Sequence, residues 1–338
     1  GSNGKICDII REILLDKQAV CSYGAKTELS MEGGRIISTE PFYAYIKIAE
    51  GCSNNCTYCA IPSIRGKYRS RRMEDIVKEA RWLAENGVTE LVVVAQDTTR
   101  YGEDIYGKSM LPELLTALCE IDGFKWIRTL YCYPERITDE LLDVIAKEDK
   151  LVKYLDMPIQ HCDKTILKRM NRHGDRETLT ALIKKIREKI PNVTLRTTLI
   201  TGFPGETEEQ FEELCEFVKE IRFERLGCFA YSPEEGTPAE QFEDQVPLKD
   251  RERRAEIIME EQMIISDSLN EAALDSEVEV VCEGFDRYAE CYYGRSQADA
   301  PEIDGKIFFL SEDKVRVGEY VKVKIDDTMD YDLIGSKM

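Results

Sequence analysis

The stretch YAYIKIAEGCSNNCTYC, residues 43–59, joins a short apolar run to three closely spaced cysteines. Its first eight residues are rich in aromatic and β-branched side chains and predict a strand. Cys52, Cys56 and Cys59 follow in the loop at the C-terminal end of that strand, with the spacing C-x3-C-x2-C and with Tyr58 just before the last cysteine. Parallel-sheet proteins place their active sites at this end of the strands. The stretch therefore predicts a functional site at the mouth of a parallel sheet.

The same alternation of short apolar runs and amphipathic stretches continues to about residue 231. The predicted strands are YAYIKIAE, TELVVVAQ, KWIRTLYCY, YLDMPIQ, VTLRTTLIT and RLGCFAY, and each but the last is followed by a predicted helix. This pattern indicates an α/β layer with a parallel sheet. Six such units permit an open, partial barrel or a doubly wound sheet, and periodicity leaves both alternatives open.

After the α/β region the pattern of apolar and polar residues changes. A polar connection, SPEEGTPAEQFEDQVP, leads into a predicted helix at about 248–270. Residues 275–338 then read as short alternating strands broken by glycine-rich or acidic turns, which predicts a small antiparallel β-barrel.

The composition is that of a globular chain with a strong acidic balance. The 338 residues include 46 Lys and Arg against 65 Asp and Glu, a formal charge of −19. Without an apolar run of roughly 18 residues, we expect neither a membrane span nor a membrane partner. Twelve scattered cysteines and no secretion signal indicate reduced thiols and a cytoplasmic location. The charge disfavours nucleic acid, which is bound largely through cations, and favours a basic partner.

Three thiolates from one loop suit a particular kind of metal centre. They can hold three irons of a four-iron cluster and leave the fourth iron open, as a catalytic centre requires. A structural zinc site is an alternative, but it needs four ligands. The nearest histidine, His161, is more than a hundred residues away and no second CxxC pair exists. A coincidental grouping of thiols is the third alternative.

This spacing resembles that of the radical S-adenosylmethionine (SAM) enzymes, and the preceding strand and the six predicted units add to the resemblance. It implies a partial, six-stranded (βα)6 barrel, with Cys52, Cys56 and Cys59 as ligands of a [4Fe–4S] cluster and Tyr58 as a candidate cofactor contact. In that family the open iron chelates the amino and carboxylate groups of SAM. An electron from the cluster, which needs an external reductant, then splits SAM to a 5′-deoxyadenosyl radical.

Three further stretches match positions that the radical SAM enzymes use for the cofactor. In AQDTTRYG, after the second predicted strand, Gln96 and Asp97 stand where a polar or acidic motif holds the amino group of SAM; a capped loop is the alternative. In MPIQHCDKTILKRMNR, Gln160 is a candidate cofactor contact, whereas His161 and Cys162 could equally be packed residues.

The third stretch, TTLITGFPGETEEQF, resembles the adenine-side segment and contains Phe203. Gly202 and Gly205 in it would permit close backbone approach, and a turn leading into a helix is the alternative.

Together with YCYPE and the small terminal barrel, these motifs resemble the methylthiotransferase branch, whose C-terminal module is called TRAM. The stretch QDTTRYG favours the members that place a methylthio group on the β-carbon of an aspartate in a small-subunit ribosomal protein. The rival is the branch that modifies tRNA adenosine. Residues 271–338 carry 17 Asp and Glu against 8 Lys and Arg, a charge that repels tRNA and attracts a basic ribosomal protein.

Cations near the site are candidates for orienting a carboxylate of the substrate or of the cofactor. They are Arg196 on the fifth predicted strand and the basic run after the cysteines, Arg65, Lys67, Arg69, Arg71 and Arg72. Solvated surface charge is the plainer interpretation of the run.

The resemblance also implies a second cluster in an N-terminal domain that we expect to be missing here. The predicted organisation is a remnant of that domain and a linker at 1–35, the barrel with its trailing helix at 36–270, and the TRAM-like barrel at 271–338. We therefore expect this chain to hold one cluster and to cleave SAM without transferring a methylthio group. An alternative of another class is a non-catalytic iron–sulfur or zinc module that docks a basic protein.

Overall fold

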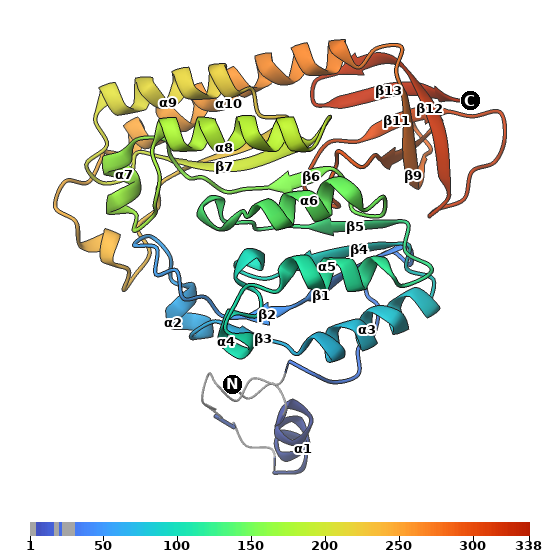
Figure 1. Ribbon diagram of the computed structural model, residues 1–338, viewed down its shortest axis with the longest axis horizontal. Coiled ribbons are helices and arrows are strands. Elements are labelled where there is room, and N and C mark those ends of the chain that lie inside the picture. Colours follow the sequence, from blue (N-terminus) through green and yellow to red (C-terminus); the bar gives the residue numbers. More distant parts are fainter. Residues whose placement is uncertain (1–4, 17–19, 22–30) are drawn as a thin grey trace.

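The computed structural model describes residues 5–16, 20–21 and 31–338 of the chain (Figure 1). The helices of this part are α1 (Ile6–Asp16), α2 (Ile61–Arg65), α3 (Met73–Glu85), α4 (Glu103–Tyr106), α5 (Leu111–Cys119), α6 (Asp139–Lys147), α7 (Lys164–Arg169), α8 (Arg176–Lys189), α9 (Glu208–Ile221) and α10 (Leu248–Ala272), with short 3-10 turns η3 (Thr98–Arg100), η4 (Pro134–Arg136) and η5 (Pro238–Gln241). The strands are β1 (Tyr43–Lys47), β2 (Ala49–Glu50), β3 (Arg69–Ser70), β4 (Glu90–Val94), β5 (Trp126–Thr129), β6 (Tyr154–Asp156), β7 (Thr194–Thr201), β8 (Arg225–Ala230), β9 (Glu277–Asp286), β10 (Cys291–Arg295), β11 (Ile307–Leu310), β12 (Tyr320–Met329) and β13 (Asp332–Lys337).

Residues 43–230 form a partial parallel barrel. The strands pair as β1-β4-β5 and β6-β7-β8, all parallel, and an isolated bridge between Ile127 and Leu151 joins the two sheets. No pairing returns β8 to β1 within the described residues, so the barrel is open on that side. The prediction of a six-stranded partial barrel is confirmed.

The helices pack on one face of this sheet. Ile46, Leu91 and Leu195 point outward and pack with helix residues such as Ile76 and Leu214 in one large buried cluster. Burial of each such side chain contributes about 1.5–3 kcal/mol. A doubly wound sheet would carry helices on both faces, and here the inner face meets the C-terminal part of the chain instead.

The C-terminal part is a closed five-stranded barrel with the strand order β10-β11-β13-β12-β9. Its pairs are antiparallel except for β11 and β13, which run parallel. The predicted small barrel is thus confirmed with one parallel pair. Helix α10 leads into it along β8 and α9, and Asn270 near its end donates to the Asp330 carbonyl.

The module packs against the end of the parallel sheet at which the strands begin (Figure 1). Tyr320 of β12 lies edge-on to Trp126 of β5 at 4.8 Å between ring centroids, and its hydroxyl is 3.2 Å from Thr89 Oγ1. Arg295 reaches further in and pairs with the buried Glu90 at 2.8 Å. The opposite end of the sheet, where the strands finish, carries the cysteines, and the module reaches toward it with the segment that contains Ile303. In the described part of the chain no helix is long and apolar enough to cross a membrane.

Candidate radical SAM site

The cysteine loop begins directly after β2, at the end of the sheet predicted from the sequence. Gly51 precedes Cys52 with a φ of +76°, and a Cβ there would lie 2.3 Å from the Lys67 carbonyl oxygen. Only glycine fits this backbone without strain. The Cys52 N–H donates to the Gly66 carbonyl at 3.1 Å, so the two ends of the loop are held together.

Two distant segments hold the middle of the loop. The Thr57 N–H donates to the Met170 carbonyl at 3.1 Å, just after α7, and the Thr57 carbonyl accepts from the Ala239 N–H of η5 at 2.9 Å. Asn171 donates to the Asn54 and Asn55 carbonyls at 3.0 Å each. Backbone contacts thus fix the loop, and the thiols remain available as ligands.

Without a metal, the three thiols are unfavourably placed for ionisation, because they are close together and partly or fully buried. Cys52 and Cys56 are buried, Cys59 is half-buried, and all three are unpaired. Burial raises the pKa of Cys52 and of Cys59, and the neighbouring Cys56 raises both further. A cationic iron centre offsets this cost of bringing thiolates together, so the donor set suits the cluster.

The spacing of these ligands also bears on the zinc alternative. Within the described residues no group of three or more His, Cys, Asp and Glu side chains lies close enough to hold a single metal ion. In an iron–sulfur cluster each thiolate binds a different iron, so its ligands stand farther apart than those of one ion. The geometry therefore gives a zinc site no support.

Two tyrosines and an arginine flank Cys56. The Tyr133 hydroxyl lies 3.5 Å from Cys56 Sγ. The Arg172 guanidinium stacks 4.2 Å from the centre of the Tyr133 ring and donates to the Tyr58 hydroxyl at 3.5 Å. Burial raises the pKa of Tyr58 and of Tyr133 well above the usual value, so both hydroxyls keep their protons. Tyr58 thus lies beside Cys56, and its contact to the cofactor stays a prediction.

Sequence reasoning assigned no role to Tyr133 and Arg172. Both lie in stretches that the sequence singled out, YCYPE and MPIQHCDKTILKRMNR. The contacts of Tyr133 to Cys56 and of Arg172 to Tyr133 join distant parts of the sequence, and only the positions of aromatic and cationic residues near strand ends could have suggested them.

Of the pair after β4, Asp97 is tied to the cysteine loop and Gln96 is not. Asp97 is fully buried and accepts from Asn54 Nδ2 at 2.9 Å and from Thr99 Oγ1 at 2.5 Å. Arg136 lies 3.7 Å from its carboxylate. Gln96 is exposed and lines the cavity described below. Asp97 thus positions the loop, and its contact to the cofactor stays a prediction.

The residues predicted after β6 and β7 lie deeper in the structure. Gln160 is mostly buried, with a φ of +71°, four residues after the end of β6. Phe203 is fully buried and packs edge-on against Tyr58 at 6.5 Å. His161 and Cys162 are both fully buried, as the packed alternative expects. The Nε2 of His161 faces the Glu206 carboxylate at 3.6 Å, because its Nδ1 accepts from the Asp163 N–H.

The two glycines of the predicted adenine-side segment make their close approach to side chains of this chain. A Cβ on Gly202 would lie 2.4 Å from Arg251 Cγ, and one on Gly205 would lie 2.6 Å from Asp244 Oδ2. Packing alone therefore demands both glycines, and a role in binding the cofactor stays a prediction.

The arginines and lysines predicted to orient a carboxylate lie in different environments in the structure. Arg196 pairs with Asp156 at 2.9 Å and lies 3.7 Å from Asp304 of the C-terminal module. Arg71 is buried and pairs with Glu32 and Glu79, at 2.6 and 2.7 Å. The other four cations of the run are partly or fully exposed, and one of them, Arg65, lies 4.0 Å from Glu50. The structure thus gives Arg71 a structural role and brings neither Arg71 nor Arg196 to the cysteine loop.

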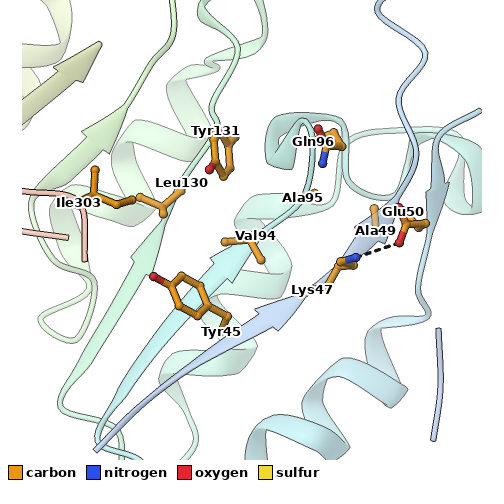
Figure 2. A pocket seen from close by; sticks show the side chains of 10 residues that line it. All are labelled: Tyr45, Lys47, Ala49, Glu50, Val94, Ala95, Gln96, Leu130, Tyr131 and Ile303. Carbon is orange, nitrogen blue, oxygen red and sulfur yellow. Dashed lines mark hydrogen bonds and ion pairs between the residues drawn. The ribbon is translucent and has the colours of Figure 1, made fainter. Parts of the chain in front are cut away.

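A cavity of about 400 Å³ lies on the inner face of the sheet beside the cysteine loop (Figure 2). The residues that line it come from the C-terminal ends of three strands and from the module: Tyr45, Lys47, Ala49, Glu50, Val94, Ala95, Gln96, Leu130, Tyr131 and Ile303. Glu50 precedes Cys52 by two residues, which places the two Cα atoms within roughly 7 Å. The cavity thus borders the start of the cysteine loop, although none of the three cysteines lines it.

A partial parallel barrel with three thiols on the loop after β2 is the arrangement expected of a radical SAM enzyme, and comparisons with known proteins assign the chain to that class. The profile of the radical SAM superfamily matches residues 46–218, and that of the TRAM domain matches residues 276–337. Among solved structures, coproporphyrinogen III oxidase (HemN) from Escherichia coli, a radical SAM enzyme, is similar in fold. Its TM-score is 0.50 at 21% identity, over 68% of this chain and 54% of that one.

Curated relatives narrow the class further. The ribosomal protein uS12 methylthiotransferase RimO of Clostridium tetani is 50% identical over 98% of this chain and 74% of its own length. The protein of the same name from Caldanaerobacter subterraneus subsp. tengcongensis is 49% identical over 99% of this chain and 76% of its own length. The chain belongs to this family of methylthiotransferases, RimO.

Proposed function

We propose that this chain acts on a small-subunit ribosomal protein, uS12, and supports the placement of a methylthio group on the β-carbon of an aspartate. Cys52, Cys56 and Cys59 hold the [4Fe–4S] cluster. When bound, the cluster supplies the electron that cleaves SAM to a 5′-deoxyadenosyl radical. The protein residues fix the loop and offer a largely apolar cavity, with Lys47 in its wall, near it.

The observation that carries this proposal is the arrangement of three unpaired cysteines on a loop fixed by its backbone. The loop is pinned by Gly66, Met170 and Ala239, so its backbone is held in place before any metal binds. A fixed supporting backbone of this kind favours a catalytic centre. A cavity directly beside the loop gives a substrate side chain room to approach.

We further propose that this chain holds one cluster and that methylthio transfer needs a second one. Outside residues 52–59, no ten-residue stretch of the sequence contains more than two cysteines. The longer Clostridium tetani relative, of which this chain covers 74%, has room for additional ligands. The chain alone is then competent for SAM cleavage and incompetent for the transfer.

The acidic C-terminal module is proposed as a docking surface for the basic substrate protein. Its exposed acids include Glu277, Glu290, Asp326 and Asp327. Opposite charge steers and orients the encounter of two proteins. Because the module lies at the far end of the barrel from the cysteines, the partner has to span the length of the sheet (Figure 1).

Anaerobic reconstitution tests the function directly. The chain is loaded with iron and sulfide and incubated with SAM, dithionite and purified uS12. We expect about four irons per chain, formation of 5′-deoxyadenosine, and no methylthio product. A full cluster that yields no 5′-deoxyadenosine would overturn the function. Iron near eight per chain, or methylthiolated uS12, would overturn the single-cluster proposal and leave the function standing.

A further inference from the structure

The cavity beside the cysteine loop contains one cation among the described residues that line it, Lys47. Lys47 is the last residue of β1, and its side chain is about half exposed, at 52%. Figure 2 shows its ammonium group pointing toward Glu50 along the cavity wall. The remaining wall is largely apolar, with Val94, Leu130 and Ile303. A charge in such a setting interacts more strongly with a ligand than one on open surface.

The bond that holds Lys47 leaves it free to take a second partner. Its Nζ lies 2.9 Å from Glu50 Oε2. An ammonium group has three donors, so one carboxylate does not saturate it. Glu50 is nearly buried, and it also accepts from the Gly51 N–H and lies 4.0 Å from Arg65 Nε. Glu50 therefore keeps other partners when Lys47 turns to a ligand.

The other cations near the inner face are already engaged. Arg196 faces two carboxylates, Asp156 and Asp304. Arg172 is almost fully buried against Tyr133 and donates to the Pro158 carbonyl at 2.9 Å. A carboxylate that entered the cavity would thus meet Lys47 first, with the exposed Gln96 at the end of β4 as a neighbouring amide donor.

We propose that Lys47 binds the carboxylate of the substrate aspartate in this cavity and so positions the adjacent β-carbon beside the cysteine loop. This inference rests on the proposed function. It assigns Lys47 as a positioning residue that recognises a carboxylate and discriminates aspartate from its neutral isostere, asparagine.

Peptide binding measures this discrimination without turnover. The reconstituted protein, with SAM and without reductant, is titrated with a uS12 peptide that carries the target aspartate, and with the same peptide carrying asparagine. We expect the wild-type protein to bind the aspartate peptide about ten-fold or more tightly, the range of a hydrogen bond to a charged group. K47M should bind both peptides equally, and K47R should recover part of the preference because it keeps the charge.

Controls separate Lys47 from general charge effects and from the cofactor. K108M removes a lysine from another Lys–Glu pair, Lys108 with Glu113 at 2.7 Å on the surface, and should leave the preference intact. E50Q should also retain it, because Lys47 keeps its charge. SAM affinity and iron content should be unchanged in K47M, which also confirms that the variant is folded.

The outcomes separate the proposed role of Lys47 from the proposed function of the protein, on which that role rests. If K47M keeps the preference for aspartate, or loses SAM affinity in step with peptide affinity, the role of Lys47 is wrong while the function stands. If the wild-type protein binds neither peptide and forms no 5′-deoxyadenosine with uS12, the proposed function fails, and the inference fails with it.

Discussion

At the scale of single residues, Tyr133 is a side chain that contacts a cysteine ligand directly. Its hydroxyl lies 3.5 Å from Cys56 Sγ and its ring is held by Arg172. Hydrogen bonds to ligand sulfurs tune iron–sulfur centres, and loss of such an outer contact typically costs 10–100-fold in metal affinity or activity. Y133F should therefore retain its cluster about ten-fold less well, measured as the rate of iron release to a chelator.

A matched control lies two residues away. Tyr131 lines the cavity and is 42% exposed, and no hydroxyl contact of Tyr131 to a cysteine is present in the described residues. Y131F should release iron at the wild-type rate. Equal rates for Y133F and the wild-type protein would show that the Tyr133 hydroxyl does not stabilise the cluster.

The sequence predicted the ligands at this scale better than their surroundings. The spacing of Cys52, Cys56 and Cys59 is a local pattern, and the loop follows a strand as expected. Tyr133 and Lys47 could not be assigned from the sequence, because their roles depend on where strands far apart in the chain bring side chains together. Arg196 was a candidate from its place on a strand, but its charge is engaged by Asp156 and by Asp304 of the module.

At the scale of elements, α9 begins with a capping box that closes the segment after β7. The Thr207 hydroxyl accepts from the Gln210 N–H at 3.3 Å, and the Gln210 side chain accepts from the Thr207 N–H at 3.0 Å. Removal of such a cap costs about 1 kcal/mol. T207A should lower the free energy of unfolding by about that amount, measured by urea denaturation with tryptophan fluorescence.

The conservative variant T207S serves as the control, since serine keeps the accepting oxygen. It should lose only a few tenths of a kcal/mol. If T207S is destabilised as strongly as T207A, the loss comes from the methyl group and its packing, and the capping interpretation is wrong.

Most elements of the barrel could be predicted from their periodicity. Each of the six predicted apolar runs contains one of the parallel strands, and amphipathic stretches between them are helices. These strands are β1, β4, β5, β6, β7 and β8. The predicted first strand covers both β1 and β2, but its division into two, the strand β3 and the pairing of β2 with β3 at Ala49–Ser70 and Glu50–Arg69 were not predicted. Strands β2 and β3 are too short to show any alternation, and their pairing depends on the loop between them.

At the scale of the whole molecule, the contact between the barrel and the C-terminal module was beyond the sequence. The module was predicted as an acidic surface, and much of its charge is indeed exposed. Several of its charged residues face inward instead: Arg295 pairs with Glu90, Asp299 with Arg225 and Asp304 with Arg196. Local sequence patterns do not indicate which distant segments pair. The count of charged residues in the C-terminal module therefore could not separate its exposed charges from those that face the barrel.

The innermost of these pairs predicts how firmly the module is attached. Arg295 and Glu90 are 2% and 0% exposed, and Arg295 also pairs with Glu283 at 2.6 Å. Arg128 also pairs with the buried Glu90, at 3.1 Å, so the loss of Arg295 removes one of two arginine partners of that carboxylate and should cost about 1–3 kcal/mol. R295M should therefore lower the unfolding temperature and speed proteolysis between α10 and β9. It should also weaken binding of the aspartate peptide, because Ile303, which lines the cavity, lies in the connection between β10 and β11 that begins after Arg295.

K125M provides the matched comparison at the same interface. Lys125 pairs with Glu279 of β9 at 2.6 Å, but the two side chains are 41% and 36% exposed. An exposed pair contributes about 0–1 kcal/mol, so K125M should resemble the wild-type protein in thermal unfolding, proteolysis and peptide binding. Equal effects of K125M and R295M would mean that the number of pairs, rather than their burial, attaches the module. An unchanged R295M would show that apolar packing around Trp126 and Tyr320 suffices to hold it and to close the cavity.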